Sequence, residues 1–287
     1  MTVKDRTILV LSIVISIAMF APKSAIAACL GDKSAQPLKV YIVPQLTASQ
    51  TYTRWGPLLD QLGKNAEQCF DLIVPVSIPQ FEADLANGKP DFVFMNPYHM
   101  AMKWRNHQYI PLVASSEPIF GVITVRRDSK QSSLKDLSGS KIGFPAPNAF
   151  AASLLIRSML DINGIAFEPD YLKTHSTVYR SVVRGAVAAG GGIHATLSAE
   201  PTELQDELRI LAETKRYTAH PFSASARVPE AIQKRVQTAF LNLAKTNEGT
   251  ELLNRIQMPK PMEVTYKDNY QALEALKLEK YVVKSVD

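Results

Sequence analysis

Two kinds of hydrophobic pattern alternate along the first half of the chain. Short apolar runs that suit buried strands are separated by segments whose apolar residues recur at helical spacing. In one such segment, Trp55, Leu58, Leu59 and Leu62 share one face of a helix. The predicted strands are 38–44, 70–78, 91–95, 109–114 and 119–127, and the predicted helices are 52–65, 79–89 and 97–105. Strands that alternate with helices predict parallel βαβ units.

The same alternation restarts after residue 128. A one-turn helix and a strand at 141–144 precede a helix that begins near Asn148 and stops at Asn163-Gly164. The remaining predicted elements are a helix over 178–192 that ends in glycines, a strand over 207–214, and helices over 229–245, 248–256 and 267–280. The pattern therefore predicts two α/β units, the second inserted before the chain returns to pack on the first.

The first 27 residues have the layout of a secretory signal peptide. Lys4 and Arg6 precede an apolar run from Ile8 to Ala21, and Ala25-Ile26-Ala27 is a small-x-small cleavage pattern. An uncleaved membrane anchor is the alternative. The run has about 14 residues, however, whereas about 20 are needed to span a bilayer. We therefore expect cleavage after Ala27 and export to the periplasm.

The chain has two cysteines, and two uses of them are open. Cys29 closes a stretch that resembles a lipoprotein cleavage box, although Pro22, Lys23 and Ser24 separate that box from the apolar run. Alternatively, an oxidising compartment allows Cys29 and Cys69 to pair. Cys29 precedes the first strand and Cys69 the second, so both lie near one end of the sheet if those strands are parallel neighbours. We favour the disulfide over the lipid anchor.

Charge and motifs restrict the function. Loss of residues 1–27 removes three basic residues and one acidic one, so the formal charge falls from +5 to +3, too little to suggest a nucleic-acid partner. No nucleophile-elbow, Walker or zincin pattern is present, and Asp60, Glu82 and Glu117 show no readable pairing. No two histidines have zinc-site spacing. We expect neither catalysis, nor a metal, nor a cofactor.

Several segments carry a resemblance to a known family. They are YIVPQLTASQTYTRWGPLLDQLG, FEADLANGKPDFVFMNPYHMA, VITVRRDSKQSSLKDLSGSKIGFP and the late DNYQALEAL. They resemble the phosphate/phosphonate-type periplasmic substrate-binding proteins, from about Leu38 to Leu278. The most specific pieces are Asp91-x-x-x-Met95-Asn96-Pro97-Tyr98 and Ser133-Leu134-x-Asp136-Leu137-x-Gly139.

The resemblance implies an architecture and partners. It implies the two-lobed periplasmic-binding-protein fold, each lobe a mostly parallel sheet flanked by helices, with two strands crossing near 115–121 and 215–222. Lobe 1 then comprises 28–118 and 219–287, and lobe 2 comprises 119–218. A monomer would trap a small anionic ligand, a phosphonate-like or phosphate-like oxyanion, for an inner-membrane ABC permease. A membrane sensor kinase is an alternative partner, and an enzyme on this fold is the less favoured reading.

Candidate ligand-binding residues follow the ends of the predicted strands, because ligands bind beyond the carboxyl ends of parallel strands. Helices that begin there present unpaired N–H groups. The candidates are Gln45, Tyr52, Asn96, Tyr98, Asn148, Ala149, Phe150, Ala151, His175, Ser176 and Tyr179.

Each candidate has a plainer interpretation. Asn148 suits the N-cap of the helix that follows, and Asn96 and Tyr98 suit a turn. Phe150 suits a core position, and Ser176 a cap that leaves His175 exposed. His194 and His220 lie beside the expected cleft or hinge segments and are weaker candidates.

Two departures from the family leave the ligand open. The family's Ser/Thr-rich helix start is Asn148-Ala149-Phe150-Ala151 here, so only backbone donors remain. At Ala189-Gly190-Gly191-Gly192, an aspartate common in relatives is missing. We therefore expect weaker phosphate binding than in relatives, and a less charged or partly apolar ligand.

Overall fold

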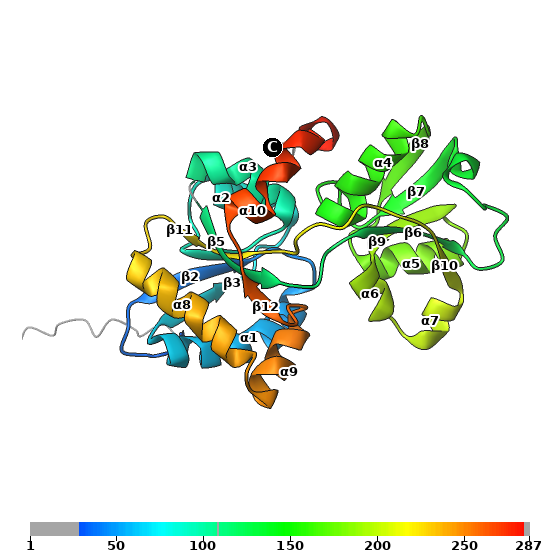
Figure 1. Ribbon diagram of the computed structural model, residues 1–287. Coiled ribbons are helices and arrows are strands. Elements are labelled where there is room, and N and C mark those ends of the chain that lie inside the picture. Colours follow the sequence, from blue (N-terminus) through cyan, green and yellow to red (C-terminus); the bar gives the residue numbers. More distant parts are fainter. Residues whose placement is uncertain (1–28, 108, 284–287) are drawn as a thin grey trace, which may run out of the picture.

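The chain forms two α/β lobes that lie side by side (Figure 1). The computed structural model describes residues 29–107 and 109–283, and the predicted signal peptide lies outside the described residues. Each lobe has one sheet with helices on both faces. The expected two-lobed α/β class is confirmed.

The first lobe is built on a seven-stranded sheet in the order β1-β3-β2-β4-β11-β5-β12. Its strands are β1 Leu30–Gly31, β2 Pro37–Ile42, β3 Cys69–Ile73, β4 Phe92–Phe94, β5 Tyr109–Ser115, β11 Phe222–Ser225 and β12 Pro261–Glu263. Its helices are α1 Ala48–Ala66, α2 Ile78–Ala86, α3 Pro97–His107, α8 Glu230–Leu243, α9 Asn247–Arg255, α10 Tyr266–Asn269, and the 3-10 helices η3 Gln271–Leu276 and η4 Leu278–Tyr281. Strand β2 pairs in parallel with β3 and β4, as the βαβ pattern predicts.

The second lobe has a five-stranded sheet in the order β10-β6-β9-β7-β8. Its strands are β6 Gly121–Arg126, β7 Ser140–Phe144, β8 Phe167–Tyr171, β9 Ala189–Ile193 and β10 Leu208–Glu213. Its helices are the 3-10 helix η1 Leu134–Leu137, the π-helix η2 Phe150–Leu155, α4 Ile156–Ile162, α5 His175–Val183, α6 His194–Ser198 and α7 Thr202–Asp206.

Two segments connect the lobes, one between β5 and β6 and one between β10 and β11 (Figure 1). Ile119 and Tyr217 pair antiparallel where the segments pass each other. Because the chain leaves on one segment and returns on the other, β5 pairs antiparallel with β11, and β6 with β10. The sheets are therefore mixed rather than mostly parallel as expected.

Helix α1 begins earlier than its apolar pattern indicates. Thr47 forms a capping box with Gln50, so the helix starts at Ala48 rather than near Tyr52. Trp55 and its predicted apolar partners are buried, as expected. Tyr52 therefore lies one turn inside the helix rather than at its predicted start, and its side chain is half-exposed.

The predicted helix over 178–192 is wrong in its second half. Helix α5 ends at Val183, Gly185 turns the chain at φ 71°, and the glycine run forms β9, the central strand of its sheet. A Cβ at Gly190 would lie 2.6 Å from Val178 Cγ1, and one at Gly192 would lie 2.1 Å from the Tyr179 hydroxyl. A Cβ at Gly191 would meet the Ala152 carbonyl at 2.3 Å. Successive glycines thus let α5 and η2 approach opposite faces of one strand.

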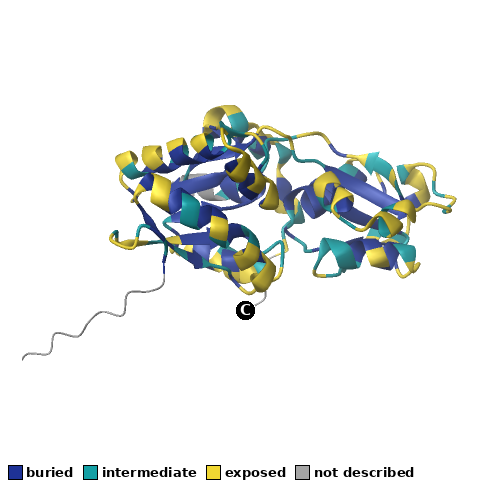
Figure 2. Ribbon diagram, turned by 90° about the horizontal axis from the view of Figure 1, so that it is seen from below, coloured by how far each residue is buried: buried dark blue, intermediate teal, exposed yellow. Residues whose placement is uncertain are grey.

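Other differences concern short elements. The predicted helix over 267–280 is divided into α10, η3 and η4, because Tyr270 leaves helical geometry and Lys277 has φ 48°. The strand predicted over 70–78 ends at Ile73. Strands β8, β11 and β12 have no strong apolar alternation and were not predicted. Figure 2 shows buried residues concentrated on the sheets and exposed ones on the outer faces of the helices.

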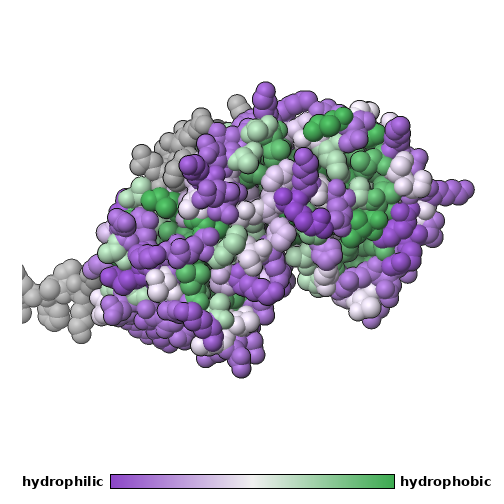
Figure 3. Space-filling model, in the orientation of Figure 1, coloured by the Kyte–Doolittle hydropathy of each residue, from purple (hydrophilic) through white to green (hydrophobic). Residues whose placement is uncertain are grey.

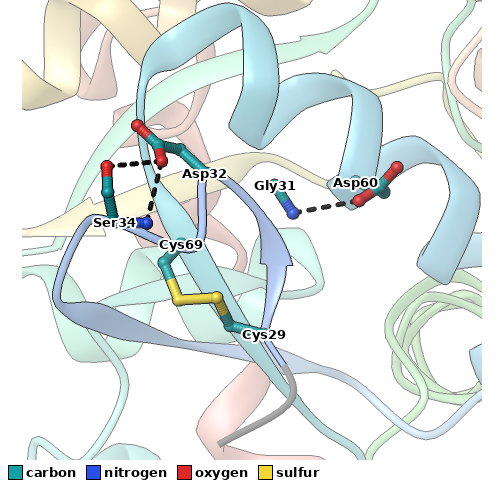
Figure 4. The surroundings of a disulfide bond; sticks show 6 residues. All are labelled: Cys29, Gly31, Asp32, Ser34, Asp60 and Cys69. Carbon is teal, nitrogen blue, oxygen red and sulfur yellow. Dashed lines mark hydrogen bonds between the residues drawn. A yellow bond between two sulfur atoms is a disulfide. The ribbon is translucent and has the colours of Figure 1, made fainter. Parts of the chain in front are cut away.

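The predicted Cys29–Cys69 disulfide is present, with 5.5 Å between the two Cα atoms (Figure 4). Strand β1 pairs antiparallel with β3, and Gly31 lies opposite Cys69 in their register. Gly31 also donates its N–H to Asp60 on α1. A sulfur atom in a disulfide cannot carry a lipid thioether, so the structure favours the disulfide over the anchor.

We predict that the disulfide contributes strongly to stability. It closes a loop of sequence separation 40, for which the chain-entropy relation gives about 4 kcal/mol. Urea unfolding of the oxidised and reduced protein should differ by an amount of that order. A Cys29→Ser/Cys69→Ser variant should match the reduced protein, and an unchanged midpoint on reduction would contradict the prediction.

We also predict that Gly192→Ala destabilises the protein by about 1–3 kcal/mol, the usual cost of overpacking. The new methyl group would overlap the Tyr179 hydroxyl, which is held by Thr196 and the Ile193 carbonyl. Gly56→Ala is the matched control, since nothing lies within 4 Å of a Cβ there and α1 should gain about 0.5–1 kcal/mol. Adding Tyr179→Phe to Gly192→Ala should restore part of the lost stability, and equal unfolding free energies for the two glycine variants would refute the packing argument.

Candidate functional site

The candidate site is a cleft between the lobes, at the ends of β2, β4 and β7. Its inner part is a cavity of only about 40 Å³. The lining residues are Val43, Pro44, Gln45, Ile78, Asn96, Ile119, Pro145, Ala146, Ala149, Phe150, Ala151, Ala152, Lys173, His175, Ile193 and His220. A single water needs about 10–15 Å³, so this space holds only a few waters.

Two larger chambers, of about 790 and 420 Å³, adjoin the inner cavity. Gln45 lines all three spaces, His220 also lines the larger chamber, and His175 also lines the smaller one. Arg54, on α1, and Arg255, at the end of α9, line both chambers. Figure 3 shows the surface notched between the two lobes at the lower edge of the molecule. The three spaces form one cleft with a narrow inner end.

The inner end contains the helix start that departs from the family. The Ala149 carbonyl accepts hydrogen bonds from both Ser153 and Leu154, and a π-helix begins at Phe150. The first N–H groups of a helix have no acceptor within it, and Phe150, Ala151 and Ala152 at this start line the cavity. Their backbone can donate to a ligand, but no hydroxyl assists. The Phe150 ring packs edge-on against Tyr217 and is 2 % exposed, so it occupies the space rather than covering a ligand.

Seven of the predicted site residues line the cleft. They are Gln45, Asn96, Ala149, Phe150, Ala151 and His175 in the inner cavity, and Ser176 in the smaller chamber. Asn96 also caps α3 by accepting from the His99 N–H. The Ser176 hydroxyl donates to Glu200.

The structure places the other four predicted residues outside these three spaces. Tyr52 donates its hydroxyl to the Leu72 carbonyl on the outer surface. Tyr98 is buried, and burial together with nearby Glu82 raises the pKa of its hydroxyl to about 12. Tyr179 is fully buried, and burial raises the pKa of its phenol as well. Tyr98 and Tyr179 therefore pack inside the protein and Tyr52 is half-exposed, and none of the three is among the residues that line the cleft.

Asn148 is neither a helix cap nor a cleft residue. Its amide nitrogen donates to Glu82 and to the Val283 carbonyl, and its amide oxygen accepts from the Val283 N–H. The N-cap position belongs to Ala149. Glu82 also pairs with His99 at 3.0 Å. Asn148 therefore ties the second lobe to two segments of the first.

Two histidines at the inner end have lowered pKa values, so their side chains are uncharged near neutral pH. Burial lowers the pKa of His175 to about 4, and burial, reinforced by His99 and His175, lowers that of His220 to about 3. The Gln45 Nε2 group lies 3.1 Å from His220 Nε2. These two groups can share a hydrogen bond, and the tautomer of His220 decides which of them donates. Both rings can become cations if a bound anion favours that form.

The cleft walls carry positive charge that no acid balances. Two acids line the chambers, and each has a basic partner: Glu117 lies 3.7 Å from Lys260, and Glu200 lies 4.0 Å from Arg180. Within the described part of the chain, neither Arg54 nor Arg255 forms an ion pair.

Sequence reasoning missed these arginines because nothing in their local pattern distinguishes them from surface residues. Arg54 lies between buried positions of α1, and Arg255 is the last residue of α9. Helices α1 and α9 pack together, which brings residues about 200 positions apart to one wall. His220 was named as a weaker candidate, and the structure places it at the centre of the cleft.

Among residues 29–107 and 109–283, none of the helices is long and apolar enough to cross a membrane. No group of histidine, cysteine or acidic side chains in that part of the chain is arranged to hold a metal ion.

Solved structures similar to this chain share its fold. PhnD1 from Prochlorococcus marinus, in complex with methylphosphonate, is 16% identical, with a TM-score of 0.76 over 85% of this chain and 98% of that one. A Xanthomonas citri protein bound to ATP is 17% identical, with a TM-score of 0.72 over 87% of this chain and 100% of that one. A binding component of an ABC phosphonate transporter from Pseudomonas aeruginosa is 13% identical, with a TM-score of 0.71 over 85% and 86%.

A family model agrees with these structures. The model described as ABC transporter, phosphonate, periplasmic substrate-binding protein matches residues 40–270, which include both lobes and the entire cleft. The chain therefore belongs to the family of periplasmic substrate-binding proteins of phosphonate ABC transporters.

Proposed function

We propose that this protein captures an anion related to phosphonates or phosphates between its lobes and delivers it to an ABC permease. The proposal rests on Arg54 and Arg255, which line both chambers and have no acidic partner among residues 29–107 and 109–283. Guanidinium groups are well suited to binding the oxygens of phosphate-like groups in pairs. Two such groups at one cleft favour an anionic ligand.

The proposed mechanism needs binding and closure but no chemistry. Arg54 and Arg255 belong to the first lobe, whereas His175 and Ser176 reach the smaller chamber from the second. An anion that contacts both walls has more partners when the lobes are close. This difference in affinity shifts the population toward the closed form about the two connecting segments.

The ligand position proposed here differs from the helix start that resembles the family's site. That inner end is small, its Ala149 and Ala151 lack hydroxyls, and its histidines are uncharged. The chambers have both the volume and the fixed charge. Ligands named for structures of this fold include methylphosphonate and the far larger ATP, which supports a cleft that can accept anions of different sizes.

We predict that an Arg54→Ala/Arg255→Ala variant binds methylphosphonate and phosphate at least tenfold more weakly than wild type. A hydrogen bond to a charged group contributes about 1.5–3 kcal/mol, which corresponds to tenfold or more. Isothermal titration calorimetry at low salt is the measurement. As a control, Arg184→Ala removes one positive charge at the exposed end of α5, outside the lining of the cleft, and should bind like wild type. Equal affinities for all three proteins would place the anion elsewhere, and absence of anion binding by wild type would refute the function.

We further predict that anion binding takes up protons. With pKa values near 4 and 3, His175 and His220 are neutral in the free protein at pH 6, and a nearby anion raises both values. Affinity should therefore rise as pH falls from 7 to 5. Lys173 and Glu200 also line these spaces, and His99 lies near enough to His220 to help lower its pKa.

Calorimetry in two buffers of different ionisation enthalpy measures this proton uptake. Protons can be taken up by the histidines or by the ligand itself. A His175→Gln/His220→Gln variant should lose the uptake by the histidines and keep the uptake by the ligand. Identical uptake in the variant and in wild type would show that the histidines do not face the anion.

A further inference from the structure

The larger chamber exceeds what a bare oxyanion needs. Its volume of about 790 Å³ lies in the range of cavities that enclose drug-sized ligands. A methylphosphonate ion has five heavy atoms and would leave most of this space to solvent. The volume is therefore consistent with a ligand that carries a substantial organic group.

One wall of this chamber is made of planar side chains. The Phe120 ring lies beside the His194 ring, with 5.4 Å between centroids and 30° between planes. The Arg216 guanidinium lies over the Phe120 ring at 4.2 Å. All three residues line the chamber, and His194 and Arg216 are exposed. Stacked aromatic and guanidinium planes are the surfaces on which heterocyclic rings stack.

The charged wall of the chamber belongs to the first lobe. Arg54 and Arg255 come from α1 and α9 of the first lobe. His194 begins α6 of the second lobe, and Phe120 and Arg216 lie on the connecting segments. Arg216 is also paired with Glu213 at 3.1 Å, so its charge is balanced while its plane stays on Phe120. The chamber thus has an unbalanced cationic side and a planar, charge-balanced side.

We infer that the natural ligand is an organic phosphate or phosphonate that carries a planar ring, with the anionic group at Arg54 and Arg255 and the ring on the Phe120 wall. This inference rests on the proposed function, because it assigns the ligand class of the same cleft. A ligand of this shape connects Arg54 and Arg255 of the first lobe to the connecting segments and to His194 of the second lobe. Closure would then depend on the ring as well as on the charge.

Three probes separate the parts of the ligand: adenosine 5′-monophosphate has the phosphate, a sugar and a planar ring, ribose 5-phosphate lacks the ring, and methylphosphonate lacks both. Stacking of a base contributes about fivefold to a hundredfold in affinity. By calorimetry, adenosine 5′-monophosphate should therefore bind wild type at least fivefold more tightly than ribose 5-phosphate.

The variants assign this difference to the wall. Phe120→Leu keeps an apolar side chain but removes the planar ring, so it should bring the affinity for the nucleotide close to that for the sugar phosphate. Its binding of ribose 5-phosphate and the melting temperature of its free form should remain near those of wild type. Arg54→Ala/Arg255→Ala should weaken both sugar phosphates equally.

The outcomes distinguish the two claims. If ribose 5-phosphate or methylphosphonate binds as tightly as the nucleotide, the ring is not recognised and the inference is overturned while the proposed function stands. A ring preference that survives Phe120→Leu also overturns the inference, because the ring must then lie on another wall. If none of the three probes binds wild type, the proposed function fails together with the inference.

Discussion

The close approach of two helical elements to the glycine strand β9 is the constraint on which the site depends. Gly190 and Gly192 face α5, and Gly191 faces the π-helix and the Phe144 ring. Any side chain at these positions would push one of the two away. Their approach places His175, at the start of α5, and Phe150, at the start of η2, at the same inner cavity. The strand itself places Ile193 at the cleft, and His194, the first residue of α6, follows directly after it.

The same packing fills the place where the family resemblance led us to expect the anion. With Phe150 against Tyr217 and Ile119 and Ile193 beside them, little volume remains at the inner end. Desolvation keeps His175 and His220 neutral there, so the inner end has little electrostatic attraction for an anion. The wider chambers instead contain the guanidinium groups of Arg54 and Arg255, which have no acidic partner in the described part of the chain.

The two edges of the lobe interface differ in how they are held. At one edge, Asn148 connects the second lobe to Glu82 and Val283, and Asp161 on α4 contacts Lys280 and Tyr281 from the C-terminal segment. At the other edge the chambers are open. The partly buried carboxylate of Glu82 has two polar partners, His99 and Asn148. Such partners compensate for the loss of water around a charged group. We therefore expect ligand entry from the open edge.

Local pattern was enough to predict the class of fold and the buried face of α1, and it favoured the Cys29–Cys69 disulfide without excluding a lipid on Cys29. Each rests on periodicity or on the order of strands, which neighbouring residues encode. Local pattern did not determine whether the glycine run ends a helix or forms a strand, because glycine suits both a helix end and close packing in a strand. Only the packing of α5 and η2 against the two faces of β9 decides between these alternatives. The role of Asn148 was equally hidden, since its partners are 66 and 135 positions away. Arg54 and Arg255 became candidate ligand-binding residues only because α1 packs on α9. Whether an arginine has an acidic partner depends on which side chains the tertiary structure places near it, and the sequence does not show this.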